Sequence, residues 1–197
     1  DFSAEGISSY YSDEGTTITN NRIHNTGDTT FTTTYGIRLD NAGGMGGANI
    51  SNNIIYNLQR KNGTDCYGID YYTYNLSSTS RKKGLLSNNI IHLVADDGNT
   101  YGMKVNSYLD NGGADVLNNT IAITKAPNVN ITKIIYPLII DFVSGDVKNN
   151  IIYSNVNLTS GAVYGVTGAD YGGFGPSVID NNNIHLEDIT HNGGFLR

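Results

Sequence analysis

The sequence contains no tryptophan, one cysteine and three prolines, and only 15% of its 197 residues are charged. A single cysteine, Cys66, excludes an internal disulfide framework and cannot by itself hold a zinc ion or an iron–sulfur cluster. We expect its thiol to be buried. Basic residues are also few, because 12 Lys and Arg against 18 Asp and Glu give a formal net charge of −6. This balance argues against a nucleic-acid binder, since phosphate affinity comes from clustered basic side chains.

Long hydrophobic runs are absent as well. The longest apolar stretch, residues 134–143, contains Pro137 and Asp141 and is far shorter than the ~20 residues that a membrane-spanning helix needs. No segment keeps a 3.6-residue period over two turns, which argues against helical bundles and coiled coils. The abundant residues are 27 Asn, 24 Gly, 22 Ile and 14 Tyr. Such a composition is typical of short strands joined by tight turns.

An Asn-Asn pair recurs six times, and its first members lie 32, 36, 30, 31 and 32 residues apart. The positions two residues before each pair and three residues after its first Asn are aliphatic in every copy. The pairs are Asn20-Asn21, Asn52-Asn53, Asn88-Asn89, Asn118-Asn119, Asn149-Asn150 and Asn181-Asn182. A fixed period of this length is typical of solenoid architectures.

A second motif, Tyr-Gly followed by an apolar residue, lies about half a period away. Clear copies begin at Tyr35, Tyr67, Tyr101 and Tyr164; residues 5–7 and 136–138 are looser copies, with Pro137 in place of Gly in the latter. Apolar residues recur two positions further on, which is the spacing of a strand. Each unit is therefore predicted to contain short strands and an Asn corner. There, the left-handed backbone that Asn tolerates bends the chain, and stacked amides hydrogen-bond between units.

These features resemble the right-handed parallel β-helix family, the pectate-lyase-like β-solenoids and extracellular repeat proteins, over residues 5–195. The resemblance implies an all-β right-handed parallel β-helix of about six coils of ~32 residues, with three short strands per coil. β-Propellers, with four strands per blade, and calcium-binding β-rolls, with a much shorter repeat, fit less well. We expect residues 1–197 to form one domain and a piece of a longer chain, because the repeat leaves no room for polar end caps.

If the aliphatic columns face inward, their neighbours form columns on the surface. After the Tyr-Gly motif, these columns combine aromatic, acidic and basic side chains that suit a saccharide: rings stack on sugars, and an Arg/Lys pair binds uronate carboxylates. The competing explanation is a polar ladder in which opposite charges are placed together. The predicted ligand-binding residues are Tyr10, Arg38, Asp40, Asp70, Tyr72, Lys104 and Asn106.

A second outward column follows the Asn corner and contains three of the four histidines. We expect a surface aromatic ladder, either simply stacked or contacting a glycan or partner. Its members are His24, Tyr56, His92, Tyr153 and His185, with Ala122 between His92 and Tyr153. A metal site across His24 and His92 is disfavoured, because two strand spacings put the rings ~9–10 Å apart.

Enzymes that resemble this fold include polysaccharide lyases, which use calcium and an Arg or Lys base, and glycosidases, which use neighbouring Asp residues. The catalytic residues that the resemblance implies are Asp40 and Asp70 with Arg38 and Lys104. The segment Asp96-Asp97-Gly98-Asn99 suits either a calcium site or a plain turn. We expect no other cofactor or metal.

The preferred hypothesis is a non-enzymatic extracellular or cell-surface module of bacterial type, acting as a rigid scaffold or adhesin with a glycan-contacting face. Its partners are then a polysaccharide or cell-surface glycan and flanking β-helix coils or caps of the same polypeptide. Low charge, abundant Asn, Thr and Tyr and the near absence of Cys favour a secreted protein. The alternatives are a lyase- or glycosidase-type polysaccharide-degrading enzyme and a segment of a trimeric phage-type tail spike.

Overall fold

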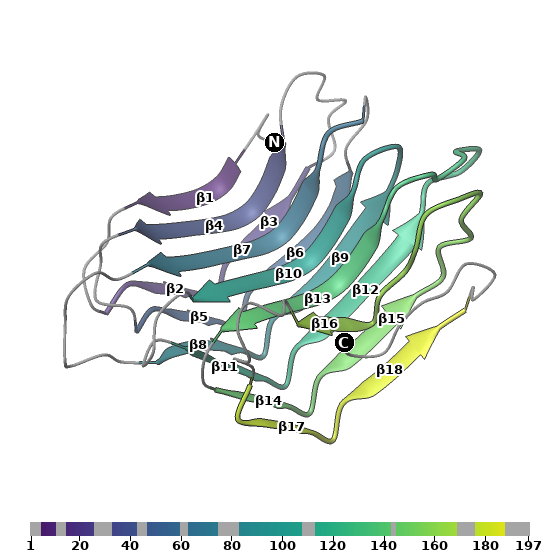
Figure 1. The fold of residues 1–197 in the computed structure, drawn as a ribbon. Coiled ribbons are helices and arrows are strands. Elements are labelled where there is room, and N and C mark those ends of the chain that lie inside the picture. Colours follow the sequence, from purple (N-terminus) through teal and green to yellow (C-terminus); the bar gives the residue numbers. More distant parts are fainter. Residues whose placement is uncertain are drawn as a thin grey trace.

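The protein is a parallel β-solenoid, shown in Figure 1 as a computed structural model. The structure describes residues 5–10, 15–25, 33–42, 47–59, 63–74, 83–107, 113–142, 145–168 and 176–187. In these residues there are eighteen strands and no helix. Each strand pairs in parallel with the strand that lies three places further along the chain, so that β1 pairs with β4 and β4 with β7. The expected all-β fold with three strands per coil is confirmed.

Three sheets of six strands run along the molecule (Figure 1). Sheet A contains β1 (Glu5–Tyr10), β4 (Thr34–Ala42), β7 (Cys66–Tyr74), β10 (Thr100–Ser107), β13 (Ile135–Phe142) and β16 (Val166–Gly168). Sheet B contains β2 (Thr17–Thr19), β5 (Asn49–Ser51), β8 (Gly84–Ser87), β11 (Ala114–Leu117), β14 (Asp146–Lys148) and β17 (Val178–Asp180). Sheet C contains β3 (Arg22–His24), β6 (Ile54–Gln59), β9 (Ile90–Ala95), β12 (Thr120–Lys125), β15 (Ile151–Ser154) and β18 (Asn183–Leu186).

The number of coils needs a correction. Roughly four turns, β4–β6 to β13–β15, are complete in the sense that each strand pairs on both sides. The sets β1–β3 and β16–β18 pair on one side within the described residues. Counting Asn pairs gave about six coils because each corner marks a turn whether or not its strands are fully paired.

The sharp corner between sheets B and C is made by the first Asn of each pair. All six first members have φ between 53° and 60°, the left-handed region that Asn adopts more readily than other non-glycine residues. The second members extend inward and are fully buried in the inner turns, as at Asn53, Asn89, Asn119 and Asn150. The first asparagine of each pair therefore bends the backbone, whereas the second places its amide in the interior.

The buried asparagines form a continuous hydrogen-bond ladder along the corner. The Asn89 side chain donates from Nδ2 to Asn119 Oδ1 (3.0 Å) and to the carbonyl of Ile50 (2.9 Å). Its Oδ1 accepts from the backbone N–H and the Nδ2 of Asn53, at 3.1 and 3.0 Å. Because both polar atoms of the amide are satisfied, burial of Asn89 costs little. The predicted Asn ladder is confirmed.

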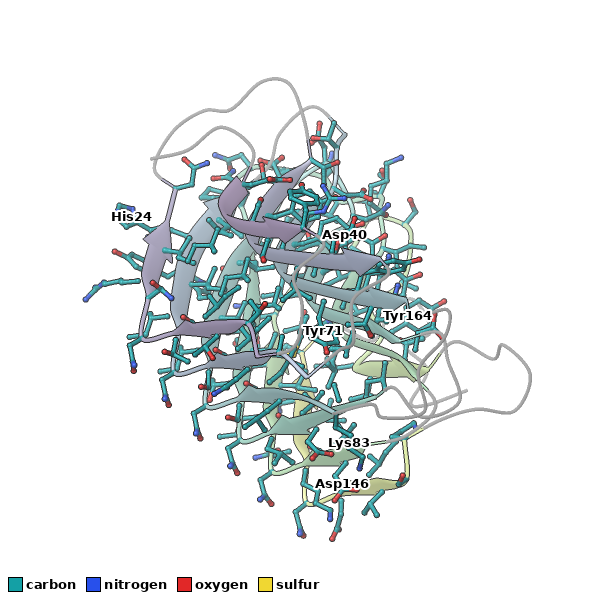
Figure 2. The ribbon with its side chains drawn as sticks, turned by 90° about the vertical axis from the view of Figure 1, so that its left-hand side faces the viewer. His24, Asp40, Tyr71, Lys83, Asp146 and Tyr164 are labelled. Carbon is teal, nitrogen blue, oxygen red and sulfur yellow. The ribbon has the colours of Figure 1, made fainter. Side chains whose placement is uncertain are left out.

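Aliphatic columns fill the space between the sheets. Ile50, Leu86, Val116 and Val147 from sheet B are fully buried and meet sheet C residues such as Ile91 in one core cluster. Cys66 also lies in this cluster as a free, buried thiol, as expected. Figure 2 shows Tyr71 inside the ring of strands, with Asp40 and His24 on the outside. The core thus runs along the solenoid axis and leaves the outer faces of the sheets for function.

The strands of sheet A bend at the Tyr-Gly motif, and they are visibly curved in Figure 1. A Cβ added to Gly68 would lie 2.4 Å from the Gly102 carbonyl oxygen and 2.6 Å from Ile91 Cγ2, so this position faces the core. The following residue, Ile69, faces the core as well. Two consecutive inward residues break the strand alternation and turn the preceding tyrosine outward. Only the middle position of the motif is skipped in the strand register, which explains why Pro137, without an N–H, is accommodated there.

Candidate functional site

Strand register assembles the predicted ligand-binding residues on sheet A, and we call this set the sheet A patch. Arg38 pairs with Asp70, which pairs with Lys104, and Tyr10, Asp40, Tyr72 and Asn106 form the neighbouring column. Figure 2 shows Asp40 at the outer side of the stack. Accessibility varies within the patch, since Tyr10 is 45% exposed whereas Asn106 is only 6% exposed. Asn106 is therefore poorly placed to contact a large ligand.

Arg38 is held by groups of its own face. Its Nη1 donates to Glu5 Oε1 at 3.1 Å and to the Tyr10 hydroxyl at 3.0 Å, and its Nη2 lies 3.6 Å from Asp40 Oδ2. The guanidinium also packs over the rings of Tyr10 and Tyr35, 5.3 and 4.7 Å from their centroids. The two hydrogen bonds from Nη1 and the two nearby carboxylates partly neutralise the guanidinium, which weakens its attraction for a ligand carboxylate.

The charge of this face is acidic. The outward columns of sheet A carry the carboxyl groups of Glu5, Asp40, Asp70 and Asp141 and the cationic groups of Arg38 and Lys104, so acidic groups outnumber basic ones. Burial alone would raise the pKa of Glu5, but hydrogen bonds from Ser8, Tyr10 and Arg38 outweigh it and lower the pKa. The lowered pKa favours the ionised form of Glu5 beside Arg38, and the excess of acidic groups on this face favours neutral over anionic ligands.

Asp70 is the carboxyl group with the most perturbed environment in the patch. Burial raises its pKa from 3.8 to about 6, and the nearby charge of Asp40 adds to the rise, although Lys104 and Arg38 oppose it. A carboxyl group that titrates near neutral pH is suited to proton transfer. The predicted grouping of Asp40, Asp70, Arg38 and Lys104 on neighbouring strands is therefore realised, with Asp70 as its titrating member.

Five tyrosines form a stack beside the patch, which we call the tyrosine stack: Tyr35, Tyr67, Tyr101, Tyr136 and Tyr164. Successive ring centroids are 4.9, 4.3, 5.3 and 5.3 Å apart, and the ring planes are within 14° of parallel. Lys104 Nζ lies 5.8 and 5.9 Å from two of these rings, those of Tyr67 and Tyr101. Because the rings cover one another's faces, the stack is not a platform for sugar rings.

The Tyr-Gly motif is visible in the sequence, but its spacing did not predict that the tyrosines stack on one another. Strict alternation from the buried Ile37 would place Tyr35 on the inside. The signal that could have revealed the stack is the glycine itself, recurring where the backbones of adjacent turns leave no room for a Cβ.

The predicted surface aromatic ladder on sheet C has the expected order but is not continuous. His24 and Tyr56 lie 5.0 Å apart in a tilted pair, and Tyr153 and His185 lie 5.6 Å apart in a stacked pair. His92 instead contacts Thr124 through Nε2 at 3.0 Å. Ala122, between His92 and Tyr153 in the register, has no ring with which to connect the two halves.

Two of the three side chains proposed for calcium, those of Asp96 and Asn99, have other partners, whereas Asp97 Oδ1 is buried without one in the described part of the chain. Asp96 Oδ2 accepts from Gln59 Nε2 at 2.7 Å, and its Oδ1 accepts from the backbone of Asp97. Asn99 donates to Asp65 Oδ1 at 3.0 Å and accepts from the N–H of Ile134. These bonds fasten successive loops together. The described residues contain no group of three or more His, Cys, Asp or Glu side chains arranged for a metal ion.

Comparison with known proteins adds no relative: no family model, curated protein or solved structure matches the chain. Within the part of the chain that the structure describes, no helix is long and apolar enough to cross a membrane. The architecture and the chemistry of the outer faces therefore carry the functional argument.

Proposed function

We propose that the protein is a non-enzymatic, extracellular or cell-surface β-solenoid module that acts as a rigid scaffold and contacts neutral glycans through the sheet A patch. The observation that carries this proposal is the state of Arg38. Glu5, Asp40 and Tyr10 already bind the guanidinium, so the patch offers hydroxyl-binding groups more readily than a free cation. We extend the proposal to an adhesin-like role beside further coils of the same polypeptide.

Rigidity follows from the architecture. Parallel strands in register fix the spacing of outward side chains at ~4.8 Å per turn, which gives a polymer a regular surface. Tyr10 supplies an exposed ring at one end of the patch, while Tyr72 and Lys104 lie toward its middle. Preorganised groups lose little side-chain entropy on binding, which favours a weak but specific contact with a sugar chain.

The binding experiment uses calorimetry with neutral polysaccharides and with polygalacturonate. We expect binding to the neutral polymers and none to the uronate, with loss of binding in Tyr72→Ala and Lys104→Ala. Lys83→Ala is the matched control, because Lys83 precedes β8 and pairs with Asp115 of sheet B at 3.5 Å. Preferential binding of the uronate, or equal loss in all three variants, would contradict the proposal.

A second function, polysaccharide cleavage of the pectate-lyase or polygalacturonase type, is favoured by the perturbed Asp70. Asp40 and Asp70 are diagonal neighbours on adjacent strands, where Cα atoms lie about 7–8 Å apart. Inverting glycosidases hold their two carboxyl groups about 6.5–9.5 Å apart, a separation that the side chains of diagonal neighbours can reach. Reducing-end and ultraviolet assays on the same polymers test it: turnover that disappears in Asp70→Asn, with binding retained, would establish an enzyme.

The tail-spike hypothesis predicts a trimer. Light scattering on the purified chain measures the mass directly, and a monomer would exclude this assembly.

A further inference from the structure

Within the tyrosine stack, the closest contact between two rings is that of Tyr67 and Tyr101. The ring centroids of Tyr67 and Tyr101 are 4.3 Å apart and their planes differ by 3°, whereas the other pairs are separated by 4.9–5.3 Å. The register of β7 and β10 holds the two residues directly opposite each other. Neither the Asn ladder nor the proposed glycan contact uses this pair.

We propose that Tyr67 and Tyr101 form an oxidative modification site, at which a one-electron oxidant joins the two rings into an intramolecular dityrosine that staples adjacent turns of the solenoid. In a phenoxyl radical the unpaired electron occupies p orbitals perpendicular to the ring. In parallel stacked rings these orbitals point at the neighbouring ring, so the two radicals already meet face to face and need only a short approach to form the first bond. Holding two reactants in contact replaces a slow encounter between molecules by a fast step within one.

The oxidant is peroxodisulfate activated by a photosensitiser. Each phenol loses one electron and its hydroxyl proton, and the two radicals join through the carbons ortho to their oxygens. The two ortho protons then move to the oxygens and restore both phenols. Peroxodisulfate accepts the two electrons and becomes two sulfate ions, so the protein loses two hydrogen atoms in total.

A proton acceptor is already present at Tyr67. Its hydroxyl donates to Asp65 Oδ2 at 3.3 Å, so the carboxylate can accept the proton as the electron leaves. Lys104 Nζ, 5.8 and 5.9 Å from the rings of Tyr67 and Tyr101, opposes positive charge on them. Oxidation at this pair is therefore coupled to proton loss, which leads to the neutral radicals that couple.

The site favours coupling within the molecule. Tyr67 is only 8% exposed, so its ring cannot reach a tyrosine of another molecule, while its contact with Tyr101 persists in the folded protein. Exposed rings behave in the opposite way. Tyr10, 45% exposed, is where coupling between molecules would be expected.

The test illuminates dilute full-length protein with tris(bipyridyl)ruthenium and peroxodisulfate. We expect dityrosine fluorescence, a monomeric band on a denaturing gel and a mass lower by two hydrogen atoms. Trypsin digestion separates residues 62–81, which contain Tyr67, from residues 84–104, in which Tyr101 is the sole tyrosine. The cross-linked product should join these two peptides. Fluorescence confined to dimeric bands would overturn the proposal.

Phenylalanine variants isolate the phenol chemistry, because a Phe ring can stack in the same place. Tyr67→Phe and Tyr101→Phe should each lose most of the monomeric product, with circular dichroism confirming that they remain folded. Tyr56→Phe on sheet C and Tyr136→Phe in the stack should keep the joined peptides. Joined peptides that survive in Tyr67→Phe would place the cross-link on another tyrosine of residues 62–81 and overturn the assignment.

Discussion

At the scale of single residues, the two members of an Asn pair look alike in the sequence and act differently in the fold. Asn88 uses its backbone, with φ at 54°, and its side chain is exposed. Asn89 uses its buried amide to connect three successive turns. The contribution of the backbone bend and that of the amide ladder can therefore be measured separately, by substituting Asn88 or Asn89.

We predict that Asn89→Ala lowers the free energy of unfolding by about 2–4 kcal/mol, because it removes a buried hydrogen bond to the Ile50 carbonyl and both hydrogen bonds that Asn89 accepts from Asn53. Asn88→Gly should change it by less than about 1 kcal/mol, since glycine adopts a positive φ readily. Urea denaturation of both variants provides the measurement. Similar losses in the two variants would show that the ladder contributes no more than the bend.

Asp70 makes stability depend on pH. Its pKa rises to about 6 on folding, chiefly through burial, so the folded state binds the proton more tightly than the unfolded state. This contribution is fully present below the ordinary value of 3.8 and is lost as the pH rises to about 6. We expect Asp70→Asn to stabilise the protein at pH 7 by about 1–3 kcal/mol and to flatten its stability profile between these values. Urea denaturation at several pH values measures both profiles. If the stability of the two proteins changed with pH in parallel, the raised pKa of Asp70 would be contradicted.

At the scale of elements, strand β9 shows how alternation divides neighbouring residues. Ile91 is fully buried in the middle of the stack, whereas Ile90 is 49% exposed on the outer face of sheet C. The sequence places two identical residues side by side, and only their distance from the Asn corner distinguishes them.

We predict that Ile91→Asp unfolds the neighbouring turns, with a loss above about 4 kcal/mol, because it places an unpaired charge in an apolar core. Ile90→Asp should keep its stability within about 1 kcal/mol, since its carboxylate remains hydrated. Thermal unfolding followed by circular dichroism compares the two. A stable, soluble Ile91→Asp protein would refute the assignment of inner and outer columns.

The inner and outer columns of residues could be predicted from the sequence, but the contacts between individual side chains could not. The repeat located Asn89 and Ile91 because a corner and a core impose the same chemistry on every turn. The outward direction of Tyr35 depends on a bend at the following glycine, which alternation alone does not reveal. Likewise, spacing placed Arg38 beside Asp70, but its side chain also reaches Glu5 in the preceding turn. The direction and the partners of a side chain depend on its rotamer and on nearby charges, and the spacing of a repeat does not determine either.

At the scale of the whole molecule, a solenoid has no long-range packing beyond neighbouring turns, so stability varies along its axis. The inner turns pair on both sides, whereas β1–β3 and β16–β18 pair on one side within the described residues. Burial follows the same gradient. Ile179 of β17 is 37% exposed, although its register partner Val147 in β14 is fully buried.

We therefore predict a gradient of amide hydrogen exchange, measured by mass spectrometry of peptides along the chain. Amides of β7–β12 should exchange most slowly, because opening them breaks ladders on both sides, and those of β1–β3 and β16–β18 should exchange fastest. Val116→Ala, which opens a cavity in a central turn, should speed exchange in β8, β11 and β14 while changing that of β1–β3 little. Equal exchange in all turns would instead show that the solenoid opens as one cooperative unit.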